Sequence, residues 1–305
     1  MLVAIGPSSF AEADPAPLDI LIKAGCEIRP NPFGRRLTEE EIIRQLDGVD
    51  GLIAGLEPLN ATVLASAPKL KALARVGIGM ANVDFDAAAT HNVKVSNTPE
   101  APSRAVAELT LAAALHLGRN LAPMSQAIHA GGWKKMISPG IDGSKVLIIG
   151  YGRIGQTTAN LFRALGAEVL VHDPFLDDDI IRQSATPVSL EAGLAAADIV
   201  SLHAGGEDAV IGAAQFALMQ PGVMLLNSAR GGLVDQDALI TALDAGKLGG
   251  VWFDTFWTEP YTGPLQGRDN VLLTPHAATY TARCRKDMES QASLNLLRDL
   301  GLAAR

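Results

Sequence analysis

The chain has 305 residues, of which 48% are hydrophobic, and a formal net charge of −8. This length and composition predict one large or two medium globular domains with substantial cores. The acidic balance, with no basic run to offset it, argues against nucleic acid as a partner. No apolar run approaches the roughly 18 residues of a membrane span, and residues 1–6 have the pattern of a strand and a turn rather than of a signal peptide. We therefore expect no membrane partner.

Cys26 and Cys284 are the only cysteines. Two cysteines make no disulfide framework, so we expect a reducing, cytoplasmic setting. Each cysteine is then expected to be a small buried side chain. We predict no metal site.

Short apolar strands alternate with helical patterns in the first hundred residues. Strands are predicted at 2–5, 27–29, 51–54, 70–74 and 94–96. A helix is predicted at 18–24, and Thr38 followed by three glutamates predicts the start of another. This alternation is typical of an α/β domain with a doubly wound parallel sheet.

A long Ala- and Leu-rich helix is predicted at 101–117, where it would bridge two domains. Further strands are predicted at 146–149, 168–171, 199–202, 223–227, 250–253 and 271–274, with helices between them, so a second parallel sheet is expected. The last helical stretch, 282–302, could return to the first domain. We therefore predict a discontinuous first domain of residues 1–99 plus 280–305 and an inserted second domain of residues 100–279.

Residues 145–173 carry the most informative pattern in the chain. An apolar strand leads into a turn with Gly150, Gly152 and Gly155, followed by a helical stretch and a second strand that ends at Asp173. This order matches the dinucleotide fingerprint. Gly150 permits the tight turn, Gly152 lets the backbone approach a pyrophosphate, and Gly155 lets helix and strand pack closely. The alternative is a plain glycine-rich turn.

Asp173 indicates which dinucleotide is bound. A carboxylate at this position accepts hydrogen bonds from the adenine-ribose hydroxyls of NAD and repels the additional phosphate of NADP. The following residues Pro174, Phe175 and Leu176 provide no arginine for that phosphate. His172 would soften the repulsion only if it were protonated. The sequence therefore favours NAD as the cofactor.

Three polar residues follow predicted strands of the second domain: Arg230, Glu259 and His276. Ligands of open α/β sheets bind at the carboxyl ends of the strands. Each residue also has an ordinary interpretation, namely a structural salt bridge for Arg230, an exposed loop acid for Glu259 and a structural histidine for His276. Together they suit hydride transfer, because a histidine moves the hydroxyl proton, a carboxylate favours its imidazolium form and an arginine stabilises charge on the carbonyl oxygen.

These motifs make the chain resemble the D-isomer-specific 2-hydroxyacid dehydrogenases, and within that family the D-3-phosphoglycerate dehydrogenases. The resemblance covers nearly the whole chain. It is carried by RVGIGMANVD from Arg75, NTPE from Asn97, VAELT from Val106, GYGRIG from Gly150, NSARGG from Asn227, DTFWTEP from Asp254, and Pro275 with His276.

The resemblance implies roles for individual residues. Arg230 would bind the substrate carboxylate and carbonyl, His276 would be the acid–base, and Glu259 would hold His276. The implied cofactor-binding residues are Gly150, Gly152, Arg153, Ile154, Gly155, Asp173, His203, Ala229 and Asp254. The predicted substrate-binding residues are Arg75, Val76, Gly77 and Arg104. The resemblance implies that backbone N–H groups around Val76 and Gly77 hold the substrate carboxylate and that Asp254 accepts from the nicotinamide amide.

The resemblance also implies the architecture: a Rossmann NAD domain inserted in a discontinuous flavodoxin-like substrate domain, and a homodimer built through the long crossing helix. The sequence departs from the family pattern after His203, where AGGEDA replaces the usual Pro-Leu and Thr, at Met80 and Ala81, and at Ala278, where glycine is frequent. With Arg305 as the last residue, we expect no serine feedback through a regulatory extension.

The substrate is expected to be a small anion. Arg75, Arg104, Arg35 and Arg36 would suit a phosphorylated 2-hydroxy acid, with 3-phosphoglycerate first, if they gather at one cleft; otherwise they are ordinary surface pairs. Glyoxylate and hydroxypyruvate are the alternatives within the family. An alternative of a different class is an NAD(H)-sensing binding protein similar to corepressors of this fold.

Overall fold

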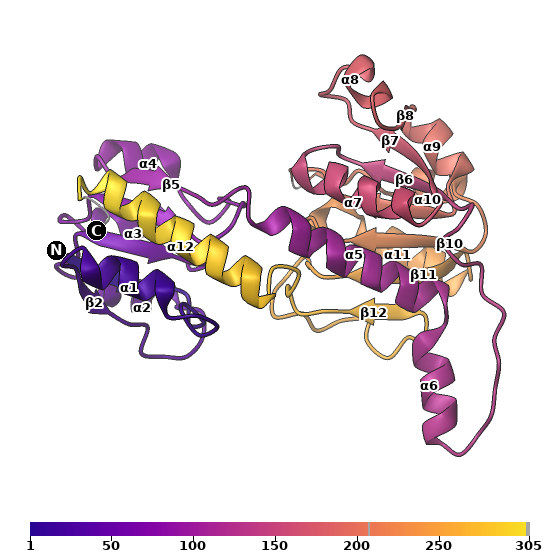
Figure 1. Ribbon diagram of the computed structural model, residues 1–305, viewed down its shortest axis with the longest axis horizontal. Helices are drawn as coiled ribbons and strands as arrows, with labels where there is room; N and C mark the ends of the chain where they lie inside the picture. The colour runs from indigo at the N-terminus through magenta and orange to yellow at the C-terminus, as the bar shows by residue number, and fades with distance from the viewer. Residues whose placement is uncertain (207, 303–305) are drawn as a thin grey trace. The chain divides into compact units, whose positions relative to one another are not determined.

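The computed structural model describes residues 1–206 and 208–302 (Figure 1). The chain divides into two compact units. Unit 1 comprises Met1–Pro102 together with the chain from Tyr280 onward, and unit 2 comprises Ser103–Thr279. Each unit contains one sheet in which all the strands run parallel. The expected class, two doubly wound parallel α/β domains, is confirmed.

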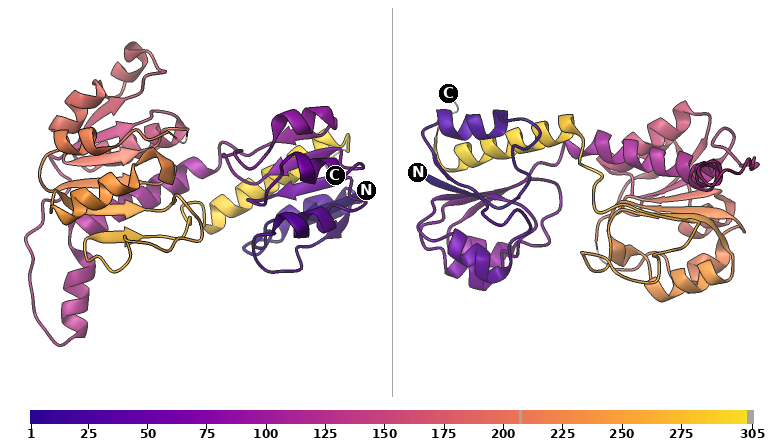
Figure 2. Two further views of the ribbon diagram at one scale, coloured as in Figure 1. Left: turned by 180° about the vertical axis from the view of Figure 1, so that it is seen from behind. Right: turned by 90° about the horizontal axis from the view of Figure 1, so that it is seen from below.

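The sheet of unit 1 has five strands in the order β2-β1-β3-β4-β5. The strands are β1 Leu2–Ile5, β2 Glu27–Arg29, β3 Gly51–Ala54, β4 Ala72–Arg75 and β5 Lys94–Ser96. The helices are α1 Ala16–Lys23, α2 Glu39–Gln45, α3 Ala61–Ala65, α4 Phe85–Thr90 and α12 Ala282–Asp299. Helices α1 and α12 lie side by side on one face (Figure 2), and α3 and α4 pack together. The last long helix of the chain therefore belongs to the first unit.

Local sequence explains why these elements form where they do. The central strand β3 is buried along its whole length, as expected for a parallel strand covered on both faces. Helix α2 begins at a capping box: the Glu41 amide donates to the Thr38 hydroxyl, and the Thr38 amide donates to the Glu41 carboxylate at 2.9 Å. Leu296 and Leu300 of the C-terminal segment pack against Gly51 at the start of β3.

The sheet of unit 2 has seven strands in the order β12-β11-β10-β9-β6-β7-β8. The strands are β6 Lys145–Ile149, β7 Glu168–His172, β8 Thr186–Pro187, β9 Ile199–Leu202, β10 Val223–Asn227, β11 Leu248–Phe253 and β12 Val271–Leu273. The helices are α5 Pro102–Gly118, α6 Leu121–His129, α7 Arg153–Ala164, α8 Asp178–Arg182, α9 Leu190–Ala196, α10 Ala213–Leu218 and α11 Gln236–Asp244, with a 3₁₀ turn η1 at Gly231–Leu233. Two apolar clusters cover the two faces of this sheet.

The strand order of unit 2 reverses next to β6. The chain runs from β6 outward through β7 and β8 on one side, and then crosses to β9 on the other side of β6. In open α/β sheets, the crevice beyond the carboxyl ends of the strands at such a switch point is where ligands bind. The turn after β6 is therefore the expected ligand-binding position of unit 2.

Both cysteines are free and buried, as expected. Among the helices of the described residues, none is long and apolar enough to cross a membrane. No group of three or more His, Cys, Asp or Glu side chains within the same residues is arranged to hold a metal ion.

Candidate active site

The turn after β6 contains three glycines, each under a different constraint. Gly150 has φ +91, and a Cβ there would lie 2.6 Å from the Cα of Ala204. Gly155 packs against the backbone of Gly150, so a side chain would push helix α7 away from the turn. Gly152 is the N-cap of α7, with no side-chain cap bond. Among the described atoms, nothing lies within 4 Å of where its Cβ would be.

This geometry leaves the N-terminus of α7 open at Gly152. The first amides of a helix have no partner within the helix, and the helix dipole places partial positive charge there. Arg153 and Ile154 form the first turn of α7. A pyrophosphate can therefore approach the backbone at Gly152 and meet the amides of this turn.

Asp173 follows β7 and is held by two backbone amides. Its Oδ2 accepts from the N–H of Tyr151 at 2.7 Å, and its Oδ1 accepts from the N–H of Phe175 at 2.9 Å. The adjacent His172 ring lies against the backbone, with Nδ1 3.2 Å from the carbonyl oxygen of Val188. The carboxylate thus has a fixed place beside the glycine turn, where ribose hydroxyls can donate to it.

His203 is a neutral, partly buried histidine next to the same turn. Burial lowers the pKa of His203 to about 3, and its Nε2 lies 2.9 Å from the hydroxyl of Ser201. Its backbone N–H donates to the carbonyl of Ile149 at 2.7 Å, which fixes the end of β9 against the end of β6. Of the AGGEDA segment that departs from the family pattern, residue 207 lies outside the described residues.

His276 and Glu259 form a hydrogen-bonded pair. Nδ1 of His276 lies 3.0 Å from Oε2 and 3.2 Å from Oε1 of Glu259, and the two side chains are 37% and 28% exposed. The Glu259 carboxylate also accepts from the N–H of Phe256 at 3.1 Å. An ionised carboxylate can only accept hydrogen bonds, so Nδ1 of His276 carries the proton of this bond. Nε2 is then the ring nitrogen that is available to exchange a proton with a ligand.

Asp254 fastens the His276 segment to the end of β11. Its buried carboxylate accepts from the hydroxyl of Thr274 at 2.6 Å and from the amides of Ala277 and Ala278 at 2.9 and 3.0 Å. The N–H of His276 donates to the carbonyl of Asp254 at 2.7 Å. These bonds hold His276 at φ +52, a conformation that is unfavourable for a non-glycine residue. The expected contact of Asp254 with the nicotinamide amide stays a prediction.

Arg230 lies in a loop that is tied to the end of β10. The buried Asn227 side chain donates to the carbonyl of Arg230 at 2.8 Å and accepts from the N–H of Ala229 at 3.0 Å. The half-buried Arg230 guanidinium donates to the carbonyl of Ala229 at 2.7 Å. A Cβ on Gly231 would lie 2.7 Å from the carbonyl oxygen of Phe256, so glycine lets this loop close against the one that carries Glu259.

Arg230, Glu259 and His276 therefore follow three adjacent strands, β10, β11 and β12, at one edge of the sheet of unit 2. Stacked aromatic rings support the middle loop: Phe256 lies 4.5 Å from Tyr261, and Phe253 lies 5.2 Å from Trp257. An imidazole, a carboxylate and a guanidinium on neighbouring loops can move a proton and bind an anion.

The predicted substrate-binding residues lie in both units, and several of them form hydrogen bonds or ion pairs within the protein. Arg104, on α5 of unit 2, pairs with Glu108 at 2.6 Å on the exposed helix surface. In unit 1, the amide of Val76 donates to the carbonyl of Ala54 at 2.9 Å, and the amide of Gly77 donates to the hydroxyl of Thr98 at 2.8 Å. Both amides thus have partners within unit 1, and the expectation that backbone N–H groups around Val76 and Gly77 hold the substrate carboxylate stays a prediction.

The other predicted arginines of unit 1 also have protein contacts. Arg35 makes a two-bond salt bridge with Glu41, at 2.7 and 2.9 Å. The Arg75 guanidinium donates to the carbonyl of Val76 and lies across Gly77, where a Cβ would be 2.9 Å from its Cζ. The expected substrate contacts of Arg35 and Arg104 stay predictions beside these ion pairs. Arg75 is the last residue of β4, at the start of the loop that the resemblance assigns to the substrate.

In each unit, several polar residues near the predicted site residues were not singled out by sequence reasoning. Asn227 and Thr274 are polar residues at the carboxyl ends of apolar strands, a signal of the same kind as the one that marked His276. Thr98 and the buried Glu57 contact residues distant in sequence, which no local pattern reveals.

A doubly wound sheet with a glycine turn after the strand at its switch point and an acid after the next strand defines a dinucleotide-binding domain. Residues 111–278 match the NAD-binding domain of the D-isomer specific 2-hydroxyacid dehydrogenases. The chain belongs to this family, and the resemblance seen in its sequence is confirmed.

Known relatives agree with this assignment. D-3-phosphoglycerate dehydrogenase of Mycobacterium leprae is 37% identical over 241 residues, which cover 77% of this chain and 46% of that protein. The structure of the TT0316 protein from Thermus thermophilus is similar with a TM-score of 0.89 and 31% identity, over 99% and 97% of the two chains. A glyoxylate reductase from Paecilomyes thermophila has a TM-score of 0.85 and 25% identity, over 98% and 95%. The chain spans about half the length of the curated relatives it matches.

Proposed function

We propose that this protein is an NAD-dependent oxidoreductase that interconverts a D-2-hydroxy acid and its 2-keto acid. The observation that carries the proposal is the hydrogen-bonded pair of His276 and Glu259, one loop away from Arg230, on the same sheet edge as the glycine turn. Membership in the dehydrogenase family supports it.

The residues of unit 2 fit NAD. Gly152 and the first turn of α7, with Arg153 and Ile154, would receive the pyrophosphate, and Asp173 would accept from the adenine-ribose hydroxyls. Ala229, at the end of β10, and the His203 turn would border the rest of the cofactor. NAD, when bound, supplies the hydride acceptor for oxidation of the hydroxyl-bearing carbon.

His276 and Arg230 perform the remaining chemistry. In oxidation, Nε2 of His276 takes the proton of the substrate hydroxyl, and Glu259 stabilises the resulting imidazolium through Nδ1–H. In reduction, the same Nε2 returns a proton to the carbonyl oxygen. The Arg230 guanidinium donates hydrogen bonds to the carboxylate and to the carbonyl oxygen, where negative charge grows during reduction.

For the substrate, we propose a phosphorylated 2-hydroxy acid, with 3-phosphoglycerate first. The likeness to the D-3-phosphoglycerate dehydrogenase of Mycobacterium leprae and the position of Arg75 immediately before the predicted substrate loop support this choice. Glyoxylate or hydroxypyruvate is the second candidate. It is favoured by the commitment of Arg35 to Glu41 and of Arg104 to Glu108, which leaves fewer cations for a phosphate, and by the likeness to a glyoxylate reductase.

The test is NADH formation across a panel of D- and L-2-hydroxy acids that includes 3-phosphoglycerate, glycerate and lactate, with wild type, His276→Ala and Arg75→Ala. We expect turnover of D-isomers that falls about 10²–10⁴-fold in His276→Ala. Preference for glycerate with no effect of Arg75→Ala would overturn the phosphorylated substrate. Tight NAD binding without turnover of any acid would support the NAD(H)-sensing protein instead.

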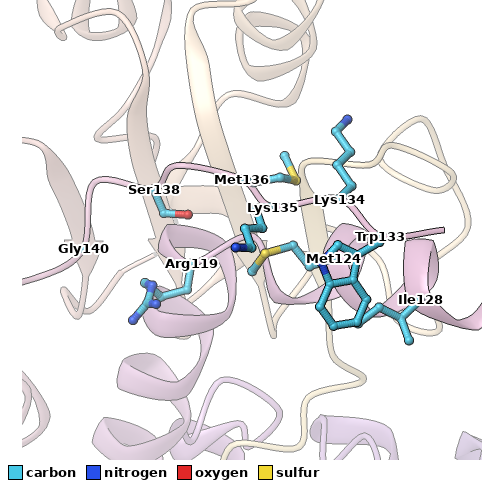
Figure 3. A pocket seen from close by; sticks show the side chains of 9 residues that line it. All are labelled: Arg119, Met124, Ile128, Trp133, Lys134, Lys135, Met136, Ser138 and Gly140. Carbon is cyan, nitrogen blue, oxygen red and sulfur yellow. The ribbon is translucent and has the colours of Figure 1, made fainter.

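The homodimer is a further part of the proposal. Helix α6 and the segment after it border a hollow of about 570 Å³ (Figure 3), lined by Arg119, Met124, Ile128, Trp133, Lys134, Lys135, Met136, Ser138 and Gly140. Trp133 is 82% exposed and Ile137 is fully exposed, which is unusual for large apolar side chains on a monomer. The lysines and arginine around them would suit a second copy of this acidic chain.

Light scattering after size-exclusion chromatography tests this interface. We expect a dimer for the wild type and a monomer for Trp133→Ser combined with Ile137→Asp, whereas Ile22→Asp on exposed α1 should leave the mass unchanged. A monomeric wild type contradicts the proposal.

The two free cysteines support a cytoplasmic, reducing compartment as the setting of this protein.

A further inference from the structure

Tyr151, between the first two glycines of the turn after β6, has a side chain to which the proposed mechanism gives no role. The residue is only 2% exposed. Its ring belongs to the apolar cluster on one face of the sheet of unit 2, together with Val171 of β7 and Ile181 of α8. Its carbonyl accepts from Nε2 of Gln156 on α7 at 2.9 Å. A buried tyrosine usually has a hydrogen-bond partner for its hydroxyl, so that partner indicates what the side chain does.

The backbone of this turn joins the end of β6 to the end of β7. The N–H of Gly150 donates to the carbonyl of His172 at 2.9 Å. The next N–H, that of Tyr151, donates to Oδ2 of Asp173 at 2.7 Å. The carboxylate that would receive the adenine ribose is therefore bonded directly to Tyr151.

The side chain of Tyr151 is bonded to the far end of the segment that Asp173 begins. This segment, residues 173–184, includes helix α8. The Tyr151 hydroxyl lies 2.7 Å from the hydroxyl of Ser184, two residues beyond the last residue of α8. Tyr151 thus contacts both ends of the segment, Asp173 through its backbone N–H and Ser184 through its hydroxyl.

Between these two bonds the segment has a polar, solvent-facing part. Residues 177–180 are exposed. The ion pairs of Arg182 with Asp178 and Asp179 lie within the segment itself, so they do not fasten it to the rest of unit 2. Its apolar side chains pack in the same cluster as the ring of Tyr151. The ring and the hydroxyl of Tyr151 therefore connect this segment to the glycine turn.

We propose that Tyr151 is a positioning residue for NAD: its buried hydroxyl, bonded to Ser184, fixes the segment 173–184 against the glycine turn, so that the Asp173 carboxylate is preset to accept from the adenine-ribose hydroxyls. An acceptor that is already held in place costs less to order when the ligand binds. The inference rests on the proposed function for the contact between Asp173 and the ribose. It assigns part of the cofactor affinity to a hydroxyl that does not touch the cofactor.

Calorimetric titration of NAD into wild type, Tyr151→Phe, Ser184→Ala and the variant with both substitutions tests the inference. Tyr151→Phe keeps the buried ring and removes only the hydroxyl. We expect the Kd for NAD to rise about three- to tenfold in either single variant, as for the loss of one hydrogen bond. The double variant should bind NAD no more weakly than either single variant, because the two hydroxyls form one bond.

Asp173→Ala shows whether the effect reaches the cofactor through the carboxylate. This substitution should itself weaken NAD binding, and adding Tyr151→Phe to it should change the Kd by less than about twofold. Tyr280→Phe is the matched control, because the Tyr280 hydroxyl also lies near that of a serine, 3.4 Å from Ser9 in unit 1. The NAD Kd of this control should equal that of the wild type. An unchanged Kd in Tyr151→Phe, or an effect that multiplies with that of Asp173→Ala, overturns the inference.

Hydrogen exchange of the peptide covering residues 173–184 separates this inference from the proposed function, because it needs neither turnover nor bound NAD. Faster exchange in Tyr151→Phe and Ser184→Ala, but not in Tyr280→Phe, supports the positioning role even if no 2-hydroxy acid is oxidised. Exchange equal to that of the wild type in all three variants contradicts the role, even if the wild type is an active dehydrogenase.

Discussion

The backbone N–H of His276 donates to the carbonyl of Asp254 at 2.7 Å, while the Asp254 carboxylate receives three bonds from the residues around that histidine. A single buried acid therefore holds the backbone of His276 in a left-handed conformation. The orientation of the His276 ring thus depends on Asp254, at the end of β11, as much as on β12, the strand that precedes His276.

Asp254→Asn should lower both the free energy of unfolding and kcat. The Asp254 carboxylate accepts from the Thr274 hydroxyl and from the amides of Ala277 and Ala278. The NH₂ group of an asparagine would face at least one of these donors and leave it without an acceptor, and an unsatisfied buried group costs about 1–3 kcal/mol. The check is urea unfolding alongside kcat. Asp244→Asn, which breaks the exposed pair with Arg268, should cost less than about 1 kcal/mol. Equal stability of the two variants would show that Asp254 does not anchor the segment.

Much of the fold follows from local pattern. The strands at 2–5, 51–54, 199–202 and 223–227 have the bounds that the sequence predicts, because largely buried parallel strands appear as short apolar runs between turn residues. The strand at 27–29 also has its predicted bounds, although none of its residues is buried. The predicted helix 101–117 is α5, shifted by one residue. The predicted bounds of strand 70–74 are wrong: Leu70 and Lys71 precede β4, which extends instead to Arg75.

Other elements escape prediction for physical reasons. β8 has only two residues and exists through its pairing with β7. Helix α6 begins after Asn120, whose backbone is left-handed, and none of its residues is buried, so no core contact accompanies the apolar spacing of Leu121, Met124 and Ile128. At the site, sequence order indicates Arg230, Glu259 and His276, but the contact of Gly231 with Phe256 and the enclosure of Glu57 by Gly6 depend on strand adjacency.

Gly152→Ala should weaken NAD binding without reducing stability. Its φ of −69° suits alanine and the space around its Cβ is open among the described atoms, so the fold tolerates the methyl group. The methyl would stand where a pyrophosphate approaches, and we expect an NAD Kd at least about tenfold higher, equivalent to about 1.4 kcal/mol. Calorimetric titration measures this.

Gly212→Ala is the matched control, because Gly212 is also a helix N-cap with room for a Cβ, on α10. Its NAD affinity should equal that of the wild type. If both variants bind NAD like the wild type, the glycine turn does not hold the pyrophosphate.

His203 should make the protein less stable in mild acid. Because its pKa in the folded state is about 3 and that of an unfolded histidine is about 6.5, the unfolded chain binds the additional proton between these values. The contribution of His203 to the free energy of unfolding is therefore complete above a pH of about 6.5 and is lost as the pH falls toward 3. We expect a loss of about 2 kcal/mol from pH 7 to pH 5.

Urea unfolding at both pH values, with wild type and His203→Gln, measures this loss. The difference between the two pH values should shrink in the variant, whereas His129→Gln, on the surface of α6, should behave like the wild type. The same pH difference in His203→Gln would show that His203 is not held neutral by the fold.

Glu259→Gln should lower kcat to a value between the wild type and His276→Ala. The amide can still accept from Nδ1–H of His276 but no longer stabilises the imidazolium. Pre-steady-state NADH formation gives the chemical step directly. A variant that matches the wild type at neutral pH would exclude a role for the carboxylate's charge.

The most direct test of the central claim is to follow deuterium from C2 of the preferred D-2-hydroxy acid. The account predicts that the deuterium is found in the NADH formed by the wild type, that the L-isomer is not oxidised, and that His276→Ala slows the transfer about 10²–10⁴-fold while still binding NAD. Deuterium released to water, or transfer that His276→Ala leaves unchanged, would contradict it.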